Sequence, residues 1–343
     1  MPLNVSANRV ISVSAPSRLH FGLYSVGHQT RKFGGIGMMI RQPRHVVEIT
    51  ESTLQASSKP TDPLASQMVT TWSEQLGRTL GLTIDPSRFS VTLRSDVTAG
   101  LPRHIGLGSG TQLAFGTAVG MSTLLNQPIP SPSEIAVAMG RAGRSAIGSY
   151  GFFQGGFLVD RGLRPKEVIA PLDLRLDFPS HWPIVLVIPN HVEGLSGAPE
   201  KSVFETITPT THTIRSQMIE LVGKQIVPAL TSADYPTFAE ALYQYGHWAG
   251  QHFSAIQNGP YNGPMATDLV NKIRQLGVPA AGQTSWGPCI FAIASDDEQA
   301  KSLIGALRDY TSSEYPDQSF QILLTAADNA GAITTLNPTE PRN

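Results

Sequence analysis

The segment 102–112 places three glycines within five residues, between two patterns of regular structure. Residues 89–93 before it alternate between apolar and polar side chains, which is typical of a strand, and a helical pattern runs from 112 to 125. Glycine adopts backbone conformations that other residues resist, so the amides of such a loop can turn toward one point. The helix N-terminus adds partial positive charge at that point. This order of elements therefore predicts a cradle for an anion, most often a phosphate.

The loop does not match two common phosphate-binding motifs. No Gly-Lys-Ser/Thr sequence ends it, which excludes a Walker loop. In the dinucleotide fingerprint Gly-x-Gly-x-x-Gly two residues precede the last glycine, whereas only one residue separates Gly108 from Gly110 here. The acidic residue that the fingerprint places about 20 positions later is also missing. A tight turn that binds nothing remains the alternative at this point, because glycine also marks ordinary turns.

The composition excludes several classes of protein. Of 343 residues, 41% are hydrophobic and 15% are charged, which is enough for a large core and excludes a disordered chain or one that coats nucleic acid. The net charge of -1 means that any phosphate site must be a local arrangement. The one cysteine, Cys289, excludes an internal disulfide and suits a reducing compartment. No membrane-length apolar run or signal pattern is present, so we expect a cytoplasmic protein that binds neither nucleic acid nor membrane.

The order of the predicted elements indicates two domains, 1–175 and 176–335, and a frayed tail at 336–343. Pro179 and Pro183 interrupt the pattern near the boundary, and Ile184–Ile188 is a fully apolar strand. The second half mixes strands and helices without regular alternation, which is typical of an α+β unit. We expect further strands at 10–13, 45–50, 289–294 and 320–325, and helices at 64–82, 131–141, 213–230, 235–253, 265–276 and 296–307.

Several segments are similar, in order along the chain, to motifs of one family. The loop resembles the phosphate loop Pro-x-x-x-Gly-Leu-Gly-Ser-Ser-Ala of the GHMP kinase superfamily, and residues 18–23 and 282–288 resemble its first and third motifs. Within this superfamily the chain resembles the β-ribofuranosylaminobenzene 5′-phosphate synthase family through the runs 18–21, 34–37, 104–112, 145–148, 155–160, 194–197 and 285–288. The resemblance implies an α+β protein with the two-domain GHMP kinase-like fold.

The resemblance to the synthases also implies an activity, that of a decarboxylating phosphoribosyltransferase. Such an enzyme joins phosphoribosyl pyrophosphate to 4-hydroxybenzoate or 4-aminobenzoate, releases CO2 and pyrophosphate, and serves tetrahydromethanopterin biosynthesis. The same resemblance implies Mg2+ as the cofactor, small-molecule substrates and a homodimer. The family usually has an acidic residue near positions 23–25, where this chain has none, so the magnesium ligands stay unassigned.

The residues themselves favour a synthase over a kinase. Many kinases of the superfamily use a second serine of the loop to help hold magnesium; here Gly110 takes that position, and Thr111 is displaced by one residue. Many also place an aspartate after a Ser-Gly-Ile run, whereas 145–149 holds no carboxylate, and serine is a poor general base. Phosphoryl transfer can proceed mainly by positioning and charge neutralisation. An ATP-dependent kinase of a small molecule and a non-catalytic binding protein therefore remain alternatives.

The predicted site must stabilise a leaving pyrophosphate, bind an aromatic acid and contain a group that can donate or accept a proton. Loss of pyrophosphate develops negative charge that loop amides, magnesium and cations can stabilise. We expect catalytic roles for Arg18, His20, His104, Asp160 and Lys201, phosphate binding by Arg103, Gly106, Leu107, Gly108, Ser109, Gly110 and Thr111, and contacts to the aromatic acid from Phe21, Ser285 and Trp286. A place in the core is the alternative for His20 and Trp286, and Asp160 could simply end a strand.

Overall fold

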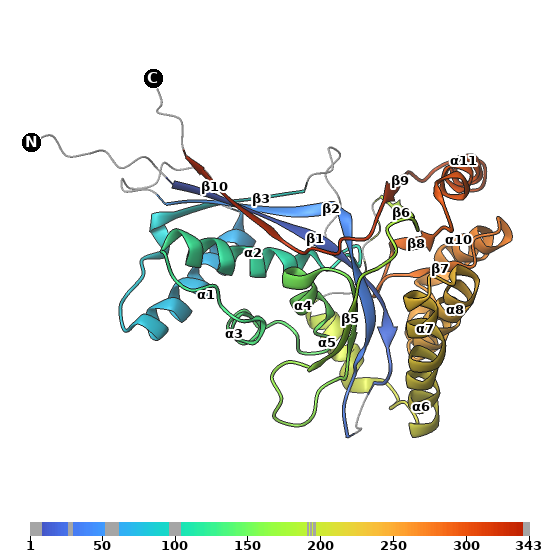
Figure 1. Ribbon diagram of the computed structural model, residues 1–343, viewed down its shortest axis with the longest axis horizontal. Helices are drawn as coiled ribbons and strands as arrows, with labels where there is room; N and C mark the ends of the chain where they lie inside the picture. The colour runs from blue at the N-terminus through green and yellow to red at the C-terminus, as the bar shows by residue number, and fades with distance from the viewer. Residues whose placement is uncertain are drawn as a thin grey trace, which may run out of the picture.

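The computed structural model describes residues 9–26, 30–51, 62–95, 104–190, 192, 194 and 197–338. These residues form two antiparallel sheets, one in each half of the molecule, with helices packed against both (Figure 1). The mixture of antiparallel sheets and separate helices confirms the predicted α+β class. No helix within the described ranges has the length and apolar character that crossing a bilayer requires.

The larger sheet has six strands in the order β10-β1-β2-β4-β5, with β3 also pairing with β2. Its strands are β1 (Arg9–Leu23), β2 (Gly35–Glu51), β3 (Phe89–Ser95), β4 (Phe157–Asp160), β5 (Leu172–Leu176) and β10 (Ile333–Pro338). One face of this sheet carries α1 (Pro63–Leu80), α2 (Ser109–Leu124), α3 (Pro132–Ala138) and α4 (Ile147–Gln154), which lie below the sheet in Figure 1; η1 (Pro86–Arg88) precedes β3.

Small residues let α2 lie unusually close to this sheet. A Cβ added at Gly116 would stand 2.8 Å from the side chain of Val47, and one at Gly120 would stand 2.7 Å from Ile49. Side chains at these positions would push the helix outward, because such distances are well below ordinary van der Waals contact. The close approach holds the start of α2, and the glycine loop before it, against β1.

The smaller sheet has four strands in the order β7-β8-β6-β9. They are β6 (Ile184–Pro189), β7 (Ala280–Gln283), β8 (Ile290–Ile293) and β9 (Phe320–Thr325). The helices of this half are α5 (Gly197–Thr206), α6 (His212–Leu221), the π-helix η2 (Val222–Ile226), α7 (Val227–Thr231), α8 (Tyr235–Gln251), α9 (Ser254–Gln257), α10 (Gly263–Gln275) and α11 (Asp297–Glu314).

A shared apolar core joins the two halves. Strand β6 is fully buried, as its apolar sequence predicts, and alternates between two clusters. Val185 and Val187 pack with residues of α10 and α11, whereas Ile184 and Leu186 pack in a cluster that also contains Leu19 of β1. The two sheets are therefore held together by side chains and not only by the connecting chain.

Several predicted elements differ from the structure. The strands expected at 10–13 and 45–50 are much longer, Arg9–Leu23 and Gly35–Glu51. The single helix expected at 213–230 is divided into α6, η2 and α7, and Pro228 in α7 has no N–H for a helical hydrogen bond. The tail prediction is wrong for residues 336–338, because they belong to β10, which pairs with β1. Residues 339–343 lie outside the described ranges. The division of the chain at 175 and 176 stays a prediction, although β10 returns the end of the chain to the first sheet.

Candidate functional site

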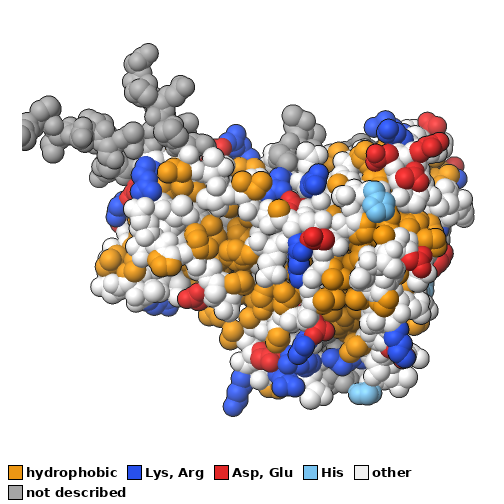
Figure 2. Space-filling model, viewed as in Figure 1, with side chains coloured by type: hydrophobic (Ala, Val, Ile, Leu, Met, Phe, Trp, Pro, Cys, Tyr) orange, Lys and Arg blue, Asp and Glu red, His pale blue; other side chains and the backbone are white. Residues whose placement is uncertain are grey.

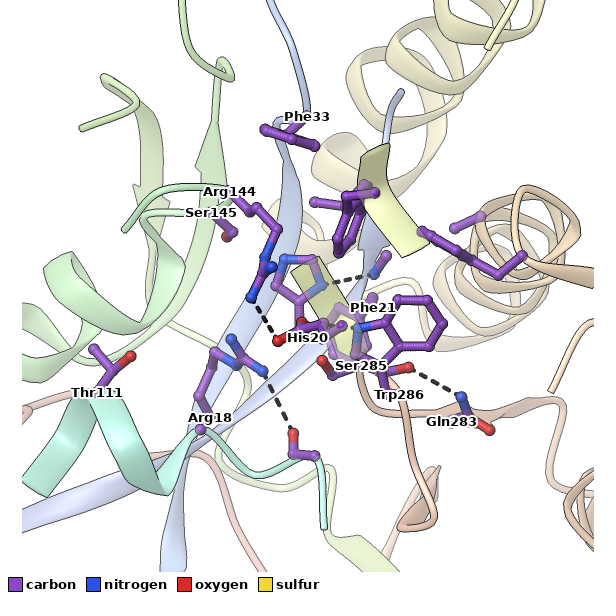
Figure 3. Close-up of a pocket in the computed structure, with 18 of the residues that line it drawn as sticks. Arg18, His20, Phe21, Phe33, Thr111, Arg144, Ser145, Gln283, Ser285 and Trp286 are labelled. Carbon is purple, nitrogen blue, oxygen red and sulfur yellow. Dashed lines mark hydrogen bonds and ion pairs between the residues drawn. The ribbon is translucent and has the colours of Figure 1, made fainter. Parts of the chain in front are cut away.

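A cavity of about 1010 Å³ lies between the two halves. Its lining comes from the end of β1, the glycine loop and start of α2, the segment 140–145 before α4, α5, the end of α8 and the turn after β7 (Figure 3). On the face drawn in Figure 2, acidic and basic side chains are interspersed around a broad apolar area. The cavity itself contains several groups that can bind an anion, among them Arg18, Arg141 and Arg144.

The glycine loop turns its carbonyl groups into the protein. Each carbonyl from residue 104 to 108 accepts a hydrogen bond, from Gly194 N, Cys289 N, Thr284 Oγ1, Arg18 N and Thr111 N respectively. The N–H groups of residues 105–110 make no hydrogen bond to any described residue, and no side chain caps α2. Gly106 and Gly108 permit this arrangement with φ values of 87° and 77°. Among the described residues, the loop therefore has amide donors without a partner beside the cavity, whereas each of these five carbonyls already accepts a hydrogen bond.

Two arginines pack over this loop. A Cβ added at Gly108 would stand 3.2 Å from Cβ of Arg18, and one at Gly110 would stand 3.2 Å from Nη1 of Arg141. The Nε atoms of both arginines are buried and have no partner in the described part of the chain. Burial lowers the pKa of Arg18 to about 10, with Glu200 acting against this shift and Arg144 adding to it. Buried donors on a cation are costly unless an anion meets them, so the pair fits an anionic ligand.

His20 is neutral and presents a donor. Its Nδ1 accepts a hydrogen bond of 3.2 Å from the N–H of Gly22, which leaves the proton on Nε2. That Nε2 is buried without a partner among the described residues. Burial and the nearby Arg18 keep the pKa of His20 well below its usual value. A neutral ring in this tautomer can donate a hydrogen bond to a ligand through Nε2, and the catalytic role expected for His20 stays a prediction.

Glu200 connects Arg144 and Trp286 across the cavity. Its Oε2 lies 2.6 Å from Nη2 of Arg144, and its Oε1 accepts a hydrogen bond of 2.8 Å from Nε1 of Trp286. The ring of Trp286 packs against Phe253 and Phe204, with centroid distances of 4.6 Å and 5.7 Å. Aromatic rings thus form the wall beside this charged group, as an aromatic ligand requires.

Backbone strain concentrates around the cavity. Phe33, His104, Ala142 and Ser285 have positive φ values of 56–63°, and all four line the cavity. A side chain in this conformation costs about 1–2 kcal/mol, and such residues gather at functional sites.

The structure brings most of the predicted site residues to this cavity. Those that line it are Arg18, His20, Phe21, His104, Gly106, Gly108, Ser109, Gly110, Thr111, Ser285 and Trp286. Leu107 does not line it; its side chain lies in the core. Arg103 and the side chain of Lys201 lie outside the residues that the structure describes.

Asp160 is buried away from the cavity. Its Oδ2 accepts hydrogen bonds from Ser145 Oγ and Ala146 N, and its Oδ1 accepts one from Gly162 N. Burial raises the pKa of this carboxyl to about 6 in spite of these donors. The side chain thus fixes the start of α4 and the turn after β4, and it does not itself line the cavity.

Sequence reasoning missed Arg141, Arg144, Phe204 and Phe253, and of the neighbouring pair Glu200 and Lys201 it assigned a role only to Lys201. The two arginines stand in Gly140-Arg-Ala-Gly-Arg144, and charged residues flanked by glycines in a loop are a signal that could have found them. The two phenylalanines carry no such signal, because helical positions on apolar faces are usually core.

The described residues offer no ready-made metal cage. No group of three or more His, Cys, Asp or Glu side chains within the described ranges could hold an ion. The carboxylates that line the cavity are Glu200, whose two oxygens have partners, and Glu205. Mg2+ commonly combines one or two carboxylates with substrate phosphates. This donor set fits an ion that arrives with pyrophosphate, and it does not fit a resident ion held by protein ligands alone.

Comparisons with known proteins agree on the family and the fold. The family model for the GHMP kinases N terminal domain matches residues 65–155, and that for GHMP kinases C terminal matches 226–312, together just over half of the chain. Two relatives named beta-ribofuranosylphenol 5'-phosphate synthase are 28% identical: the protein of Methanothermobacter thermautotrophicus, with 94% of this chain and 97% of that protein covered, and that of Archaeoglobus fulgidus, with 94% and 98%. A third protein of this name, from Methanocaldococcus jannaschii, is 26% identical, with 93% and 98% covered.

Solved structures show the same fold at much lower sequence identity. Homoserine kinase from Cytophaga hutchinsonii superposes with a TM-score of 0.65 at 15% identity, covering 95% of this chain and 97% of that chain. Phosphomevalonate kinase from Streptococcus pneumoniae superposes with a TM-score of 0.63 at 12% identity, covering 93% and 100%. The fold is thus shared with kinases, while the relatives that match in sequence carry the name of a synthase.

Proposed function

Because the chain belongs to the GHMP kinase superfamily and its curated relatives are synthases, we propose that it is a decarboxylating phosphoribosyltransferase. The predicted two-domain GHMP kinase-like fold is confirmed, and the chain is an enzyme of the transferase type. In the proposed reaction it joins phosphoribosyl pyrophosphate to 4-hydroxybenzoate or 4-aminobenzoate, and CO2 and pyrophosphate leave. A role in tetrahydromethanopterin biosynthesis, in the cytoplasm and as a homodimer, belongs to the same proposal.

One observation carries the proposal: unused anion donors and an aromatic wall share one cavity. The amides of residues 106 and 108–110, which bond to no described residue, lie at one side with the guanidinium groups of Arg18 and Arg141. Phe204, Phe253 and Trp286 lie at another. A pyrophosphate and a benzoate ring need these two environments in reach of each other.

The reaction requires no net proton transfer. The ring carbon that bears the carboxylate attacks C1 of the ribose, the C1–O bond breaks, and its electron pair leaves with pyrophosphate. The bond between the ring and the carboxylate then breaks, CO2 leaves, and that electron pair restores the aromatic ring. Charge therefore moves onto the leaving pyrophosphate, where the loop amides and arginines stabilise it. A kinase would have to take a proton from an alcohol, for which the cavity shows no unpaired buried carboxylate in the described residues.

The proposal includes magnesium, which we expect to arrive bound to the pyrophosphate of the sugar substrate. When bound, it neutralises charge on pyrophosphate. The groups that we expect to meet it are the Glu205 carboxylate and the Thr111 hydroxyl, which line the same cavity. The aromatic wall excludes water from the ring.

The direct test is release of labelled CO2. Purified protein is incubated with phosphoribosyl pyrophosphate, Mg2+ and 4-hydroxybenzoate or 4-aminobenzoate labelled at the carboxyl carbon. We expect CO2 and pyrophosphate in equal amounts, with no requirement for ATP. ATP-dependent phosphorylation of a small molecule without CO2 release would instead identify a kinase, and tight binding with no turnover of either kind would identify a binding protein.

A further inference from the structure

The carboxylate of Glu200 is paired with two strong donors that a ligand could otherwise use. Its carboxylate bridges Arg144, which precedes α4 in the first half, and Trp286, which follows β7 in the second. Figure 3 shows the guanidinium of Arg144 and the indole N–H of Trp286 directed into the cavity from opposite sides. Neither group can accept a hydrogen bond, so both can serve only an acceptor such as an oxyanion.

The surroundings of these donors fit a ligand that combines an oxyanion with an apolar part. The guanidinium of Arg144 lies 4.8 Å from the ring centroid of Phe204, one turn after Glu200 on α5. Phe253 closes the other side of Trp286. A planar guanidinium fork with an aromatic wall recognises carboxylate and phosphate groups better than a lysine would.

The pair of Glu200 and Arg144 can exchange partners without opening the core. The side chain of Arg144 is 36% exposed and that of Glu200 is 16% exposed. Ion pairs with this much solvent contact stabilise a protein only weakly, because water screens them. An incoming oxyanion with equal or greater charge can therefore replace the Glu200 carboxylate at small cost.

We propose that Arg144 and the indole N–H of Trp286 form an oxyanion subsite, which Glu200 fills in the free protein and a substrate oxyanion takes over on binding. The subsite rests on the proposed function, whose substrates carry such groups as phosphates on the sugar and a carboxylate on the aromatic acid. Glu200 is then a specificity-determining residue, because a ligand must displace its carboxylate before it can use both donors.

The test compares two charge-removing substitutions of glutamates that pair with an arginine. E200Q keeps an acceptor but loses the charge that competes for Arg144, whereas E240Q removes the same charge from the ion pair of Glu240 with Arg274, and neither of those residues lines the cavity. Calorimetric titration of each variant uses inorganic pyrophosphate and 4-hydroxybenzoate as separate probes. We expect E200Q to tighten the Kd of at least one probe about fivefold to tenfold, since a charge-assisted bond is freed, and E240Q to change it less than about twofold.

The probe that responds identifies the source of the oxyanion. Tightening for pyrophosphate assigns the subsite to a phosphate, and tightening for 4-hydroxybenzoate assigns it to the carboxylate. An unchanged or weaker Kd for both probes in folded E200Q would overturn the proposal. These titrations involve no turnover, so the subsite can be established even if no CO2 is released, and CO2 release can be established even if the subsite fails.

A second measurement protects the test against a variant that does not fold. The chain has four tryptophans, and their indole N–H groups give separate signals in the NMR spectrum of uniformly 15N-labelled protein. W286F identifies the signal of Trp286. In the native protein this signal should move on addition of the probe that occupies the subsite, because its acceptor changes from Glu200 to the probe. A Trp286 signal that stays fixed while a probe saturates the protein would count against the exchange.

Discussion

Arg18 is the residue that links the strand β1 to the glycine loop. Its backbone N–H bonds to Leu107 O, its stem packs on Gly108, and its Nη2 reaches Gly106 O at 3.4 Å. The guanidinium is buried, and its Nε has no partner in the described residues. A cation held in this way is positioned before a ligand arrives, which favours stabilisation of charge that develops during the reaction.

We therefore expect R18A to lower kcat/KM for CO2 release by about 100-fold to 1000-fold, the usual effect of removing one such donor. R18K should recover only part of the loss, because an ammonium group lacks the planar fork. R78A, which removes an exposed arginine from α1, is the matched control and should keep the native rate. Full activity in a folded R18A protein would show that Arg18 takes no part in the reaction.

Residue type and local sequence predicted some site residues and not others. The conformation of the glycine loop could be predicted from its sequence, because glycine is the residue that most readily adopts the positive φ seen at Gly106 and Gly108. For Asp160, an acid after a strand gives no hint that Ser145, Ala146 and Gly162 will surround it with donors. No local pattern predicts that Glu200 will meet Arg144, because only the fold brings these distant positions together.

At the scale of elements, the glycine loop is also a contact between the two halves. A Cβ at Gly106 would overlap the carbonyl oxygen of Thr284, and the hydroxyl of Thr284 donates to Gly106 O at 2.9 Å. The close contact leaves no room for the loop to move toward the turn after β7, and the hydrogen bond opposes its moving away. The donors of the loop and the aromatic wall are held at a fixed separation by this contact.

The contact predicts a difference between two glycine substitutions. Gly81 ends α1 with φ of 67° and has nothing within 4 Å of an added Cβ, so G81A should cost only the strain of that conformation, about 1 kcal/mol. G106A adds the overlap with Thr284 and should lower the free energy of unfolding by at least about twice as much, and weaken pyrophosphate binding as well. Urea denaturation and calorimetry measure both effects. Equal losses in the two variants would show that the contact is unimportant.

Elements with a strong local pattern were the ones that the sequence analysis placed well. The apolar run of β6 appears in the structure as a strand, and the helix expected to start at 131 begins at Pro132, where Ser131 and Glu134 form a capping box. The division of the helix after α6 and the strand β10 were not anticipated. Strand β10 has only a short alternation near Pro338, and its pairing with β1 depends on the rest of the fold.

For the whole molecule, buried histidines predict a loss of stability in acid. Burial lowers the pKa of His45 and of His252 to about 4, and that of His20 shifts in the same direction. As pH falls below the ordinary value of 6.5, the unfolded chain takes up protons that the folded protein cannot, so the free energy of unfolding decreases toward pH 4. Asp160 opposes this below about pH 6, because its raised pKa lets the folded state bind a proton first.

Three histidines outweigh one aspartate, so stability should fall between about pH 6.5 and pH 5 by on the order of 3 kcal/mol. Urea denaturation at these two pH values measures the change. H45Q keeps a hydrogen-bonding group beside Ser17 and should flatten the dependence by about one histidine's share. Stability that rises in this range, or a native slope in H45Q, would contradict the assignment.

Because β10 pairs with β1, the larger sheet can be completed only after β10 has been synthesised. The ribosome produces β1 first and β10 after every other described strand, so one edge of β1 stays uncovered while the rest of the chain emerges. An uncovered strand edge can pair with a strand of another chain. Nascent copies on one messenger are thus prone to aggregate until β10 has emerged and paired with β1.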